Sequence, residues 1–452
     1  MKRKSSQFPS VAVTAFRATS DDKRPNTDKQ VSKQWRSLCL DGQLWSTIDL
    51  IRLAPVIHPR TLEAILSSTR HCIASLSLRG LDAAEPWPIL NALRRSHGGQ
   101  LPGLATLDLR GCRSFTDSDL LHLLRIAPNL RRVNMKGLQR VNRAVLKQLA
   151  TLRQLEDVDL SRCGIDMDGL AKYLARLDPE QMARMRIFRC AGLKGPRGAA
   201  RDVAVQLGRM GSLEVLDMGG TALDDEAVRA WIGSYELNVG PSCEIVDDEL
   251  IAFGTIRHLR LTGCEYLGPK ALKDLTGRLP KLKRFELAGV PKFFRAGRDH
   301  DLSAMQIQRQ LERDRKAVVR FLGSCEQLQR VDLDDFGTRD GGVSNEMIEA
   351  LEGEAIREVN IAESGMGVDV ECLVRFVRRC KRLRVLNVDV SCATQAIAAC
   401  LPCPVHSAIR RKRGRLSECR CTVADVSPPP RTIASWQNGT NTDTARTRAC
   451  RC

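Results

Sequence analysis

The sequence predicts an α/β solenoid, in which short parallel strands line a concave face and helices cover a convex face. Three observations lead to this fold class. A pattern of spaced leucines recurs along most of the chain, most of its copies begin 25 to 31 residues apart, and aromatic residues make up only 4% of a chain that is 43% hydrophobic. A core with so few large rings is built from Leu, Val, Ile and Ala, which suits thin layers that stack on one another.

The repeated pattern is L-x-x-L-x-L-x-x-C/T/S, with conservative apolar replacements. Its copies begin at residues 45, 73, 104, 130, 155, 182, 213, 256, 282, 328, 356 and 383. In the copy that begins at Leu104, the segment around Leu107 and Leu109 is a predicted strand, because alternate side chains on a strand share one face. Self-similarity at this period is typical of leucine-rich repeats.

A helix is predicted after each strand. In the copy at Leu104, the run Thr116-Asp117-Ser118 supplies capping oxygens, and the leucines between positions 120 and 124 form an apolar stripe that ends before Pro128. One strand and one helix cannot close a core, so neighbouring units must stack. We therefore predict a leucine-rich-repeat solenoid, a horseshoe, over residues 45–395.

Two steps between copies are longer than the rest, at 43 and 46 residues, and they place inserts near 232–255 and 291–325. The second insert is highly charged, and we predict a helix around Gln306 to Phe321. Segments inserted in a solenoid often project over one face. Both inserts are therefore candidates for a role in partner choice.

The two ends of the chain differ from the repeats in composition. Residues 1–30 hold seven basic and three acidic residues and residues 404–452 hold ten and three, so the ends supply +4 and +7 of the net charge of +18. We predict that residues 1–29 and 396–452 are disordered basic segments. Because so much of the basic excess lies in these ends, we expect binding of nucleic acid to be unlikely, and a basic nucleic-acid-associated protein is the weaker alternative.

Seventeen cysteines are spread through the chain, and the first twenty residues lack the apolar run of a secretory leader. We therefore expect a reducing compartment, cytoplasm or nucleus, with free thiols. No run of residues is long and apolar enough to suggest a membrane span. Four of the cysteines, Cys112, Cys163, Cys190 and Cys264, fall where a strand exits into its turn. We predict that they are packing thiols rather than metal ligands, and we expect no cofactor.

Residues 30–50 carry a second motif, immediately before the first clear repeats. The segment from Val31 to Leu50 reads V-x-K-x-W-R-x-L and then D-x-x-L-W-x-x-I-D-L. Together with the cysteine-containing repeats, it resembles the F-box/leucine-rich-repeat proteins, in which a small helical F-box precedes the solenoid. The matching part is the second half of an F-box, a short helical remnant. The usual first half, a Leu-Pro followed by an E-I-L-x-x-I-F helix, has no counterpart in residues 1–30.

This resemblance implies a role for the motif residues. In that family the F-box docks on the adaptor subunit of an SCF-type ubiquitin ligase, and the repeats hold the substrate protein. The residues that would pack in the module or contact the adaptor are Val31, Trp35, Leu38, Leu44 and Trp45. The alternative for the two tryptophans is that they cap the open end of the repeat core.

The residues between the core leucines of each strand face the concave side and form the predicted substrate-binding surface. Its candidates are Arg110, Arg132, Lys136, Arg184, Arg186, Phe188, His258, Arg260 and Arg284. We hypothesise that five of them, Arg132, Arg184, Arg186, Arg260 and Arg284, bind an acidic or phosphorylated segment, since guanidinium groups form paired hydrogen bonds with carboxylate and phosphate. The alternative is a solvated face of mixed charge.

The motifs that carry catalysis are missing from the sequence: there is no G-x-S-x-G, no phosphate-binding glycine loop and no His/Glu metal spacing. We therefore expect a protein that is not an enzyme. Two functions remain open: a substrate-recognition subunit of an SCF-type ubiquitin ligase with an unknown protein substrate, or a leucine-rich-repeat scaffold without ligase function.

Overall fold

The computed structural model of this chain describes residues 45–49, 72–80, 100–239, 253–294, 303–337, 342–351, 353–364, 367–388 and 409–411. The predicted segment 1–29 and four of the predicted adaptor-binding residues, Val31, Trp35, Leu38 and Leu44, lie outside these ranges. So does most of the predicted segment 396–452.

Within these ranges, thirteen short parallel strands form one open sheet, and each strand pairs with the next one along the chain. The strands are β1 (Thr47–Asp49), β2 (Ser75–Ser77), β3 (Thr106–Asp108), β4 (Arg132–Asn134), β5 (Asp157–Asp159), β6 (Ile187–Arg189), β7 (Val215–Asp217), β8 (His258–Arg260), β9 (Arg284–Glu286), β10 (Arg330–Asp332), β11 (Glu358–Asn360), β12 (Val385–Val388) and β13 (Ile409–Arg411). This topology confirms the predicted leucine-rich-repeat solenoid.

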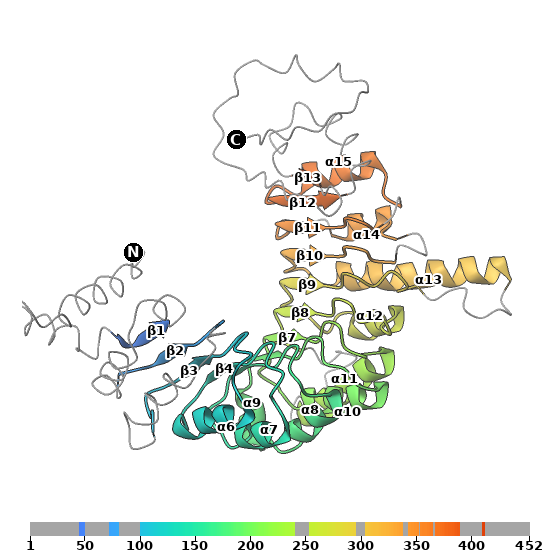
Figure 1. Ribbon diagram of the computed structural model, residues 1–452. Coiled ribbons are helices and arrows are strands. Elements are labelled where there is room, and N and C mark those ends of the chain that lie inside the picture. Colours follow the sequence, from blue (N-terminus) through green and yellow to red (C-terminus); the bar gives the residue numbers. More distant parts are fainter. Residues whose placement is uncertain are drawn as a thin grey trace, which may run out of the picture.

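Helices follow most of the strands and lie on the outer side of the curved sheet (Figure 1). They are α6 (Asp117–Ile126), α7 (Arg143–Leu149), α8 (Met167–Leu174), α9 (Pro179–Arg184), α10 (Arg197–Leu207), α11 (Asp225–Val239), α12 (Pro269–Leu275), α13 (Ala304–Gly323), α14 (Asn345–Ala350) and α15 (Val370–Arg379). The start of α6 shows the expected cap: the Thr116 hydroxyl accepts a hydrogen bond from the Asp119 N–H, and the Asp119 carboxylate accepts one from the Thr116 N–H.

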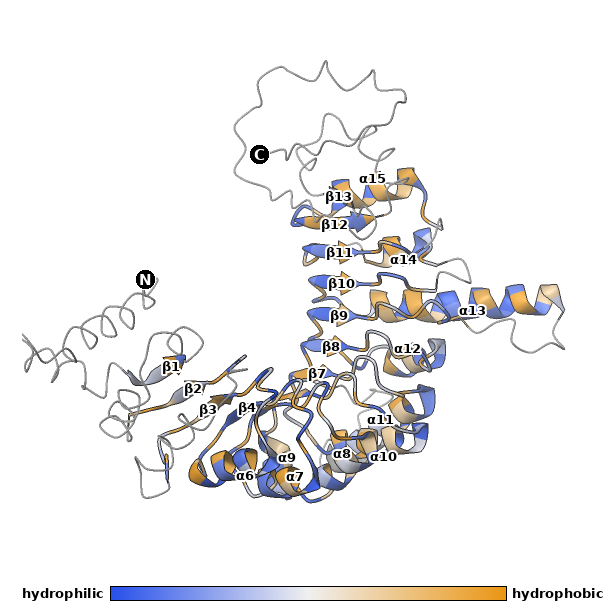
Figure 2. Ribbon diagram, viewed as in Figure 1, coloured by the Kyte–Doolittle hydropathy of each residue, from blue (hydrophilic) through white to orange (hydrophobic). Residues whose placement is uncertain are grey.

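The core lies between the sheet and the helices. From β1 to β11 the central residue of each strand is buried and stands in register with its neighbours, as Leu107 does with Val133 and Val133 with Val158. Figure 2 shows the helices striped with apolar and polar residues, as expected when one side of each packs on the sheet. Burial of these columns explains why the leucine spacing predicted the fold so directly.

Cysteine thiols connect neighbouring repeats where strands exit into turns. Cys112 Sγ donates to the Leu78 carbonyl at 2.9 Å, Cys163 Sγ to the Met135 carbonyl at 3.1 Å and Cys264 Sγ to the Met218 carbonyl at 3.3 Å. Each acceptor belongs to the preceding repeat, so the cysteine side chains link neighbouring repeats. The Met135 carbonyl also accepts the Leu138 N–H at 3.0 Å, and the Met218 carbonyl accepts the Thr221 hydroxyl at 2.8 Å. Burial raises the pKa of Cys163 to about 12 and that of Cys264 to about 11, so both remain thiols.

Cys190 follows β6 directly, but it occupies an earlier position in its repeat than the other three cysteines do in theirs. It is buried two residues after Phe188, the centre of β6, and it corresponds to Leu109 in the repeat of β3. The cysteines of the described residues are free thiols.

The longer steps of the sequence contain the longest helices that the structure describes. The expected charged helix is present as α13, which extends outward past the row of helices in Figure 1. Its inner half is anchored by Val318, Phe321 and Leu322, whereas Met305 in its first turn is 64% exposed. None of the helices in the described ranges combines the length and the apolar character needed to cross a bilayer.

Candidate functional site

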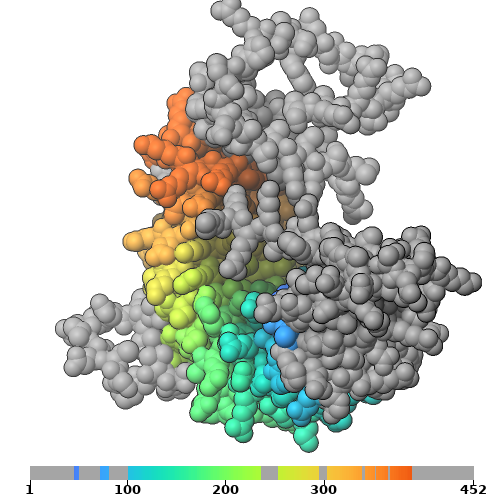
Figure 3. All heavy atoms as spheres, turned by 90° about the vertical axis from the view of Figure 1, so that its left-hand side faces the viewer, coloured from blue at the N-terminus to red at the C-terminus, as the bar shows by residue number. Residues whose placement is uncertain are grey.

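The inner side of the sheet, called the strand face below, consists of the side chains before and after the central residue of each strand. The strands are in register, so these side chains form continuous rows across neighbouring repeats. Figure 3 shows this side of the later repeats, from green to orange, as one continuous surface. The strand face is therefore a broad surface rather than an enclosed pocket.

One row of the strand face has a structural task. The Asp or Asn that follows the central strand residue accepts a hydrogen bond from the backbone N–H two residues further on. The bonds run from Arg110 to Asp108, Lys136 to Asn134, Ser161 to Asp159, Gly219 to Asp217, Asp334 to Asp332 and Ala362 to Asn360, at 3.0 to 3.4 Å. These side chains fix the turn that leaves each strand, as Asx turns do elsewhere.

Arg260 and His258 on β8 are held by acidic neighbours. Arg260 lies 3.4 Å from Asp217 on β7 and 3.1 Å from Glu286 on β9, and His258 lies 3.3 Å from Glu286. His258, followed by Arg260 and Arg330, holds the pKa of Glu286 below its usual range although burial opposes this. Both predicted substrate-binding residues are thus engaged within the sheet.

The same pairing recurs along the strand face. Arg189 lies 3.0 Å from Asp157, and Arg330 lies 3.3 Å from Glu358. Asp108 pairs with Arg110 of the following turn at 2.7 Å. Burial raises the pKa of Asp157, and Arg189 and Arg132 act against that rise. The strand face is therefore largely compensated in charge by its own residues.

The prediction for the repeat of β6 is wrong by three positions. Phe188 was expected on the surface, but it is the central residue of β6 and is fully buried. The additional helix α9 supplies Met182, and the spacing from Met182 to Met185 imitates the start of a repeat. The repeat in fact begins at Met185, so its strand-face residues are Ile187 and Arg189.

Two arginines are displaced by the same shift. Arg184 ends α9 and lies 3.8 Å from Glu180 on that helix. Arg186 immediately precedes β6 and pairs with Glu214. Neither lies on a strand of the sheet.

The five arginines of the predicted anion site do not meet. Arg132 and Arg284 are exposed and form no ion pair among the described residues, but they stand on β4 and β9. Five steps of about 4.8 Å separate these strands, roughly 24 Å in all. Arg132 and Arg284 thus belong to separate parts of the strand face, and Lys136 lies in the turn after β4.

Trp45 is 3% exposed and belongs to the same buried cluster as Ile48 and Ile73. It lies beside β1 at the first described turn of the array, where a residue that caps the core would lie. Its predicted contact with an adaptor subunit stays a prediction.

The sequence reasoning missed a second surface, where the strands turn outward. In successive repeats, one residue of this turn has a left-handed backbone. This turn column consists of Gly80, Gly111, Gly137, Arg162, Gly192, Gly220, Gly263, Gly289, Asp335 and Glu363, with φ between 52° and 83°. Such a backbone costs an L-residue about 1–2 kcal/mol, which explains the glycines.

Arg162 keeps this conformation because the repeat ladder imposes it. Its N–H donates to the Ala191 carbonyl at 2.7 Å, just as the Gly137 N–H donates to the Ser161 carbonyl at 2.9 Å. A strained non-glycine residue in such a column is a reason to look for function. Aligning the repeats in the sequence would have revealed this column of glycines and its three exceptions, Arg162, Asp335 and Glu363.

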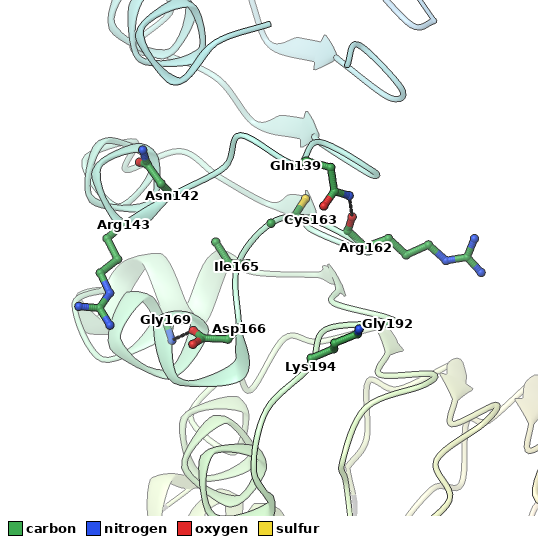
Figure 4. A pocket seen from close by; sticks show the side chains of 11 residues that line it. Gln139, Asn142, Arg143, Arg162, Cys163, Ile165, Asp166, Gly169, Gly192 and Lys194 are labelled. Atoms are coloured by element: carbon green, nitrogen blue, oxygen red, sulfur yellow. Dashed lines mark hydrogen bonds between the residues drawn. The ribbon is translucent and has the colours of Figure 1, made fainter. Parts of the chain in front are cut away.

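Two adjoining hollows flank Arg162, with volumes of about 600 and 630 Å³, and both are lined by Arg162 and Gln139. We call the pair the turn groove. In Figure 4, Arg143 and Arg162 lie on opposite sides of the larger hollow, with Lys194 at its edge. Arg110, Arg113 and Lys136 line the other hollow. No grouping of side chains suited to holding a metal ion occurs in the parts of the chain that the structure describes.

Comparison with known proteins assigns no family to this chain. No family model matches the chain, and no curated protein sequence matches it. Among solved structures, the complex of Rad7 and Elc1 in yeast is similar at 14% identity and a TM-score of 0.49, covering 86% of this chain and 90% of that chain. An internalin from Listeria monocytogenes is similar at 14% identity and a TM-score of 0.35, covering 71% of this chain and 68% of that one.

Proposed function

We propose that this chain recognises a partner protein through its strand face and takes no catalytic part itself. The observation that carries the proposal is the open thirteen-stranded sheet, whose inner side presents rows of polar and charged residues over many repeats. Broad curved surfaces of this kind suit a macromolecule better than a small substrate. Exposed cations on this face, Arg132 and Arg284, are the first contacts that we expect a partner to use.

We further propose that the chain acts as the substrate-recognition subunit of an SCF-type ubiquitin ligase, in the cytoplasm or nucleus. The motif from Val31 to Leu50 supports this, because its last part coincides with the first strand: Ile48 is the buried centre of β1. The F-box-like segment would thus be joined to the array without a linker. Ubiquitin transfer would belong to other subunits.

Co-expression with an SCF adaptor subunit tests this finer proposal. We expect the adaptor to co-elute with the full chain, and the double variant Trp35→Ala/Leu38→Ala to lose it. Gln34→Ala, at a position that the motif leaves variable, is the matched control and should keep the adaptor. If the full chain does not retain the adaptor, the protein is a leucine-rich-repeat scaffold without ligase function.

The strand face is tested separately, through the proteins that the full chain captures from cells, measured by quantitative mass spectrometry. We expect Arg132→Glu/Arg284→Glu to lose partners that the wild-type chain retains, because two unpaired cations become anions. The control is Lys147→Glu/Arg176→Glu, which reverses two exposed cations from the helical side. Equal capture by all three chains would place recognition elsewhere.

A further inference from the structure

The turn groove carries more positive charge than its surroundings neutralise. Arg110 pairs with Asp108, and Arg143 lies 3.6 Å from Asp168. By contrast, four exposed cations, Arg113, Lys136, Arg162 and Lys194, form no ion pair within the described part of the chain. This is the opposite of the pairing on the strand face.

Acidic side chains do not compete for these cations inside the groove. Asp166 is the one carboxylate among the residues that line the two hollows, and its Oδ1 accepts the Gly169 N–H at 2.8 Å. It caps α8, as Figure 4 shows. An anion that enters the groove therefore meets unpaired cations and a single carboxylate that is already hydrogen-bonded.

Gly137 and Gly192 of the turn column line the groove. A Cβ atom built on Gly137 would meet no atom within 4 Å. On Gly192 it would stand 3.0 Å from Arg162 Cγ, so the Arg162 side chain lies across the space that this glycine leaves. Gly137 thus leaves open space in its hollow, whereas the Arg162 side chain occupies the space beside Gly192. Arg162 lines both hollows.

We propose that the turn groove binds a phosphorylated segment of a partner protein. Lys136, Arg162 and Lys194 belong to three consecutive turns. Lys136 lines one hollow, Lys194 lines the other and Arg162 lines both. Their guanidinium and ammonium groups offer phosphate oxygens charge-assisted hydrogen bonds. Retention of an arginine at a strained position is explained if its side chain is used. The inference rests on the proposed function in taking the partner to be a protein.

A peptide fits better than a nucleic acid. None of the residues that line the two hollows is aromatic. Proteins that bind single-stranded nucleic acid without sequence preference combine positive grooves with aromatic side chains on which bases stack. The turn groove offers the charge without the stacking surfaces.

Fluorescence polarisation of the full chain with three labelled probes tests the inference. The probes are a short peptide of alternating glycine and phosphoserine, the same peptide with unmodified serine, and an oligothymidylate of equal charge. We expect the phosphorylated peptide to bind most tightly. The variant Lys136→Glu/Arg162→Glu/Lys194→Glu should weaken it by about tenfold or more, because three charge-assisted contacts become repulsive.

A matched variant separates the groove from net charge. Lys147→Glu/Arg153→Glu/Arg176→Glu reverses three exposed cations outside the groove and should change affinity by no more than about twofold, since distant charges are screened. Arg162→Asn tests the arginine side chain with little change to the backbone, because Asn tolerates the left-handed conformation. It should weaken binding of the phosphorylated peptide on its own.

Three outcomes would overturn the inference: equal losses in both triple variants, tighter binding of oligothymidylate than of the peptide, or no binding of the phosphorylated peptide by the wild-type chain. Co-elution of the adaptor is measured on the groove variant in parallel. If peptide binding fails while the adaptor still co-elutes, the groove inference falls and the proposed function stands.

Discussion

The strand face and the turn groove carry similar residues and differ in how those residues are used. On the strand face, Arg260 lies between Asp217 and Glu286, and Asp217 in turn accepts the Gly219 N–H at 3.1 Å. In the turn groove, Lys136 and Arg162 extend from the turns after β4 and β5 without an ionic partner in the described part of the chain. Charged residues on the strand face stabilise the fold, whereas charged residues in the turn groove are available to a ligand.

The difference shows how function can be separated from structure in a repeat protein. A side chain that recurs at one position of each repeat and makes the same backbone contact, as Asp108 and Asp217 do, maintains the repeat. A side chain that breaks the repeat at some energetic cost, as Arg162 does, calls for another explanation. The exception is more informative than the recurring residue.

The largest effect should come from removing a strand-face carboxylate. Asp217→Ala leaves the Gly219 N–H without its acceptor in a buried setting and leaves Arg260 with one acidic neighbour fewer. We expect the free energy of unfolding to fall by about 1–3 kcal/mol, the cost of a buried donor without a partner. Denaturant unfolding, followed by circular dichroism, measures this.

Two controls accompany that variant. Asp217→Asn keeps an acceptor oxygen and removes only the charge, so its loss should stay below about 1 kcal/mol. Lys136→Ala, in the turn groove, should change the stability by no more than about 0.5 kcal/mol. If Lys136→Ala were as harmful as Asp217→Ala, the contrast between the two surfaces would be wrong.

The fold followed from the sequence because burial enforces it at every repeat. The leucine columns, the Thr116 cap and the charged helix α13 are all consequences of local spacing, and the structure has each of them. The prediction for the repeat of β6 was wrong because Met182 on α9 and Met185 have the spacing of the first two apolar residues of a repeat. A pattern of apolar residues cannot distinguish a helix from a strand when the two lie three residues apart.

The charge pairs could not be predicted in the same way. Arg260 and Asp217 are 43 residues apart in sequence, across the step that holds α11, and they meet only because β7 and β8 are in register. The sequence could therefore predict which residues are candidates for the concave face. It could not predict which of them form ion pairs with neighbouring strands. Arg132 and Arg284 are likewise five strands apart because of the strand order in the sheet, and the identity of the two residues does not reveal this distance.

A smaller and opposite effect is expected at the turn column. Arg162→Gly removes a left-handed L-residue worth about 1–2 kcal/mol of strain, and the greater freedom of glycine in the unfolded chain returns about 0.5–1 kcal/mol. We expect a net stabilisation of up to about 1.5 kcal/mol, seen as a higher unfolding midpoint. The same variant should bind the phosphorylated peptide less well.

The reverse substitution checks the cause. At Gly137, φ is 83° and an added Cβ meets no atom within 4 Å, so Gly137→Ala adds strain without a clash. It should lose about 1 kcal/mol. A chain that is destabilised by Arg162→Gly would show that the arginine serves the fold, which would move it to the strand-face class of charges.

The smallest effect is a pH dependence that should separate the two kinds of carboxylate on the strand face. His258, then Arg260 and Arg330, keep the pKa of Glu286 below the ordinary value of 4.5, so the unfolded chain takes up this proton first. Glu286 therefore stabilises the fold above that value, and the contribution is lost as the pH falls through the lower, folded pKa. Glu286→Gln should remove at most about 1 kcal/mol at neutral pH and lose less stability than the wild type on acidification.

Asp332 has the opposite sign and serves as the control for Glu286. Burial raises its pKa, so its ionised form is disfavoured in the fold, and its contribution improves as the pH falls through the folded pKa. Asp332→Asn keeps an oxygen to accept the Asn360 side-chain N–H at 2.8 Å. The variant should be slightly more stable than the wild type at neutral pH and equal to it in acid. If the two variants gave parallel curves of stability against pH, neighbouring cations and burial would not decide which carboxylates stabilise the sheet.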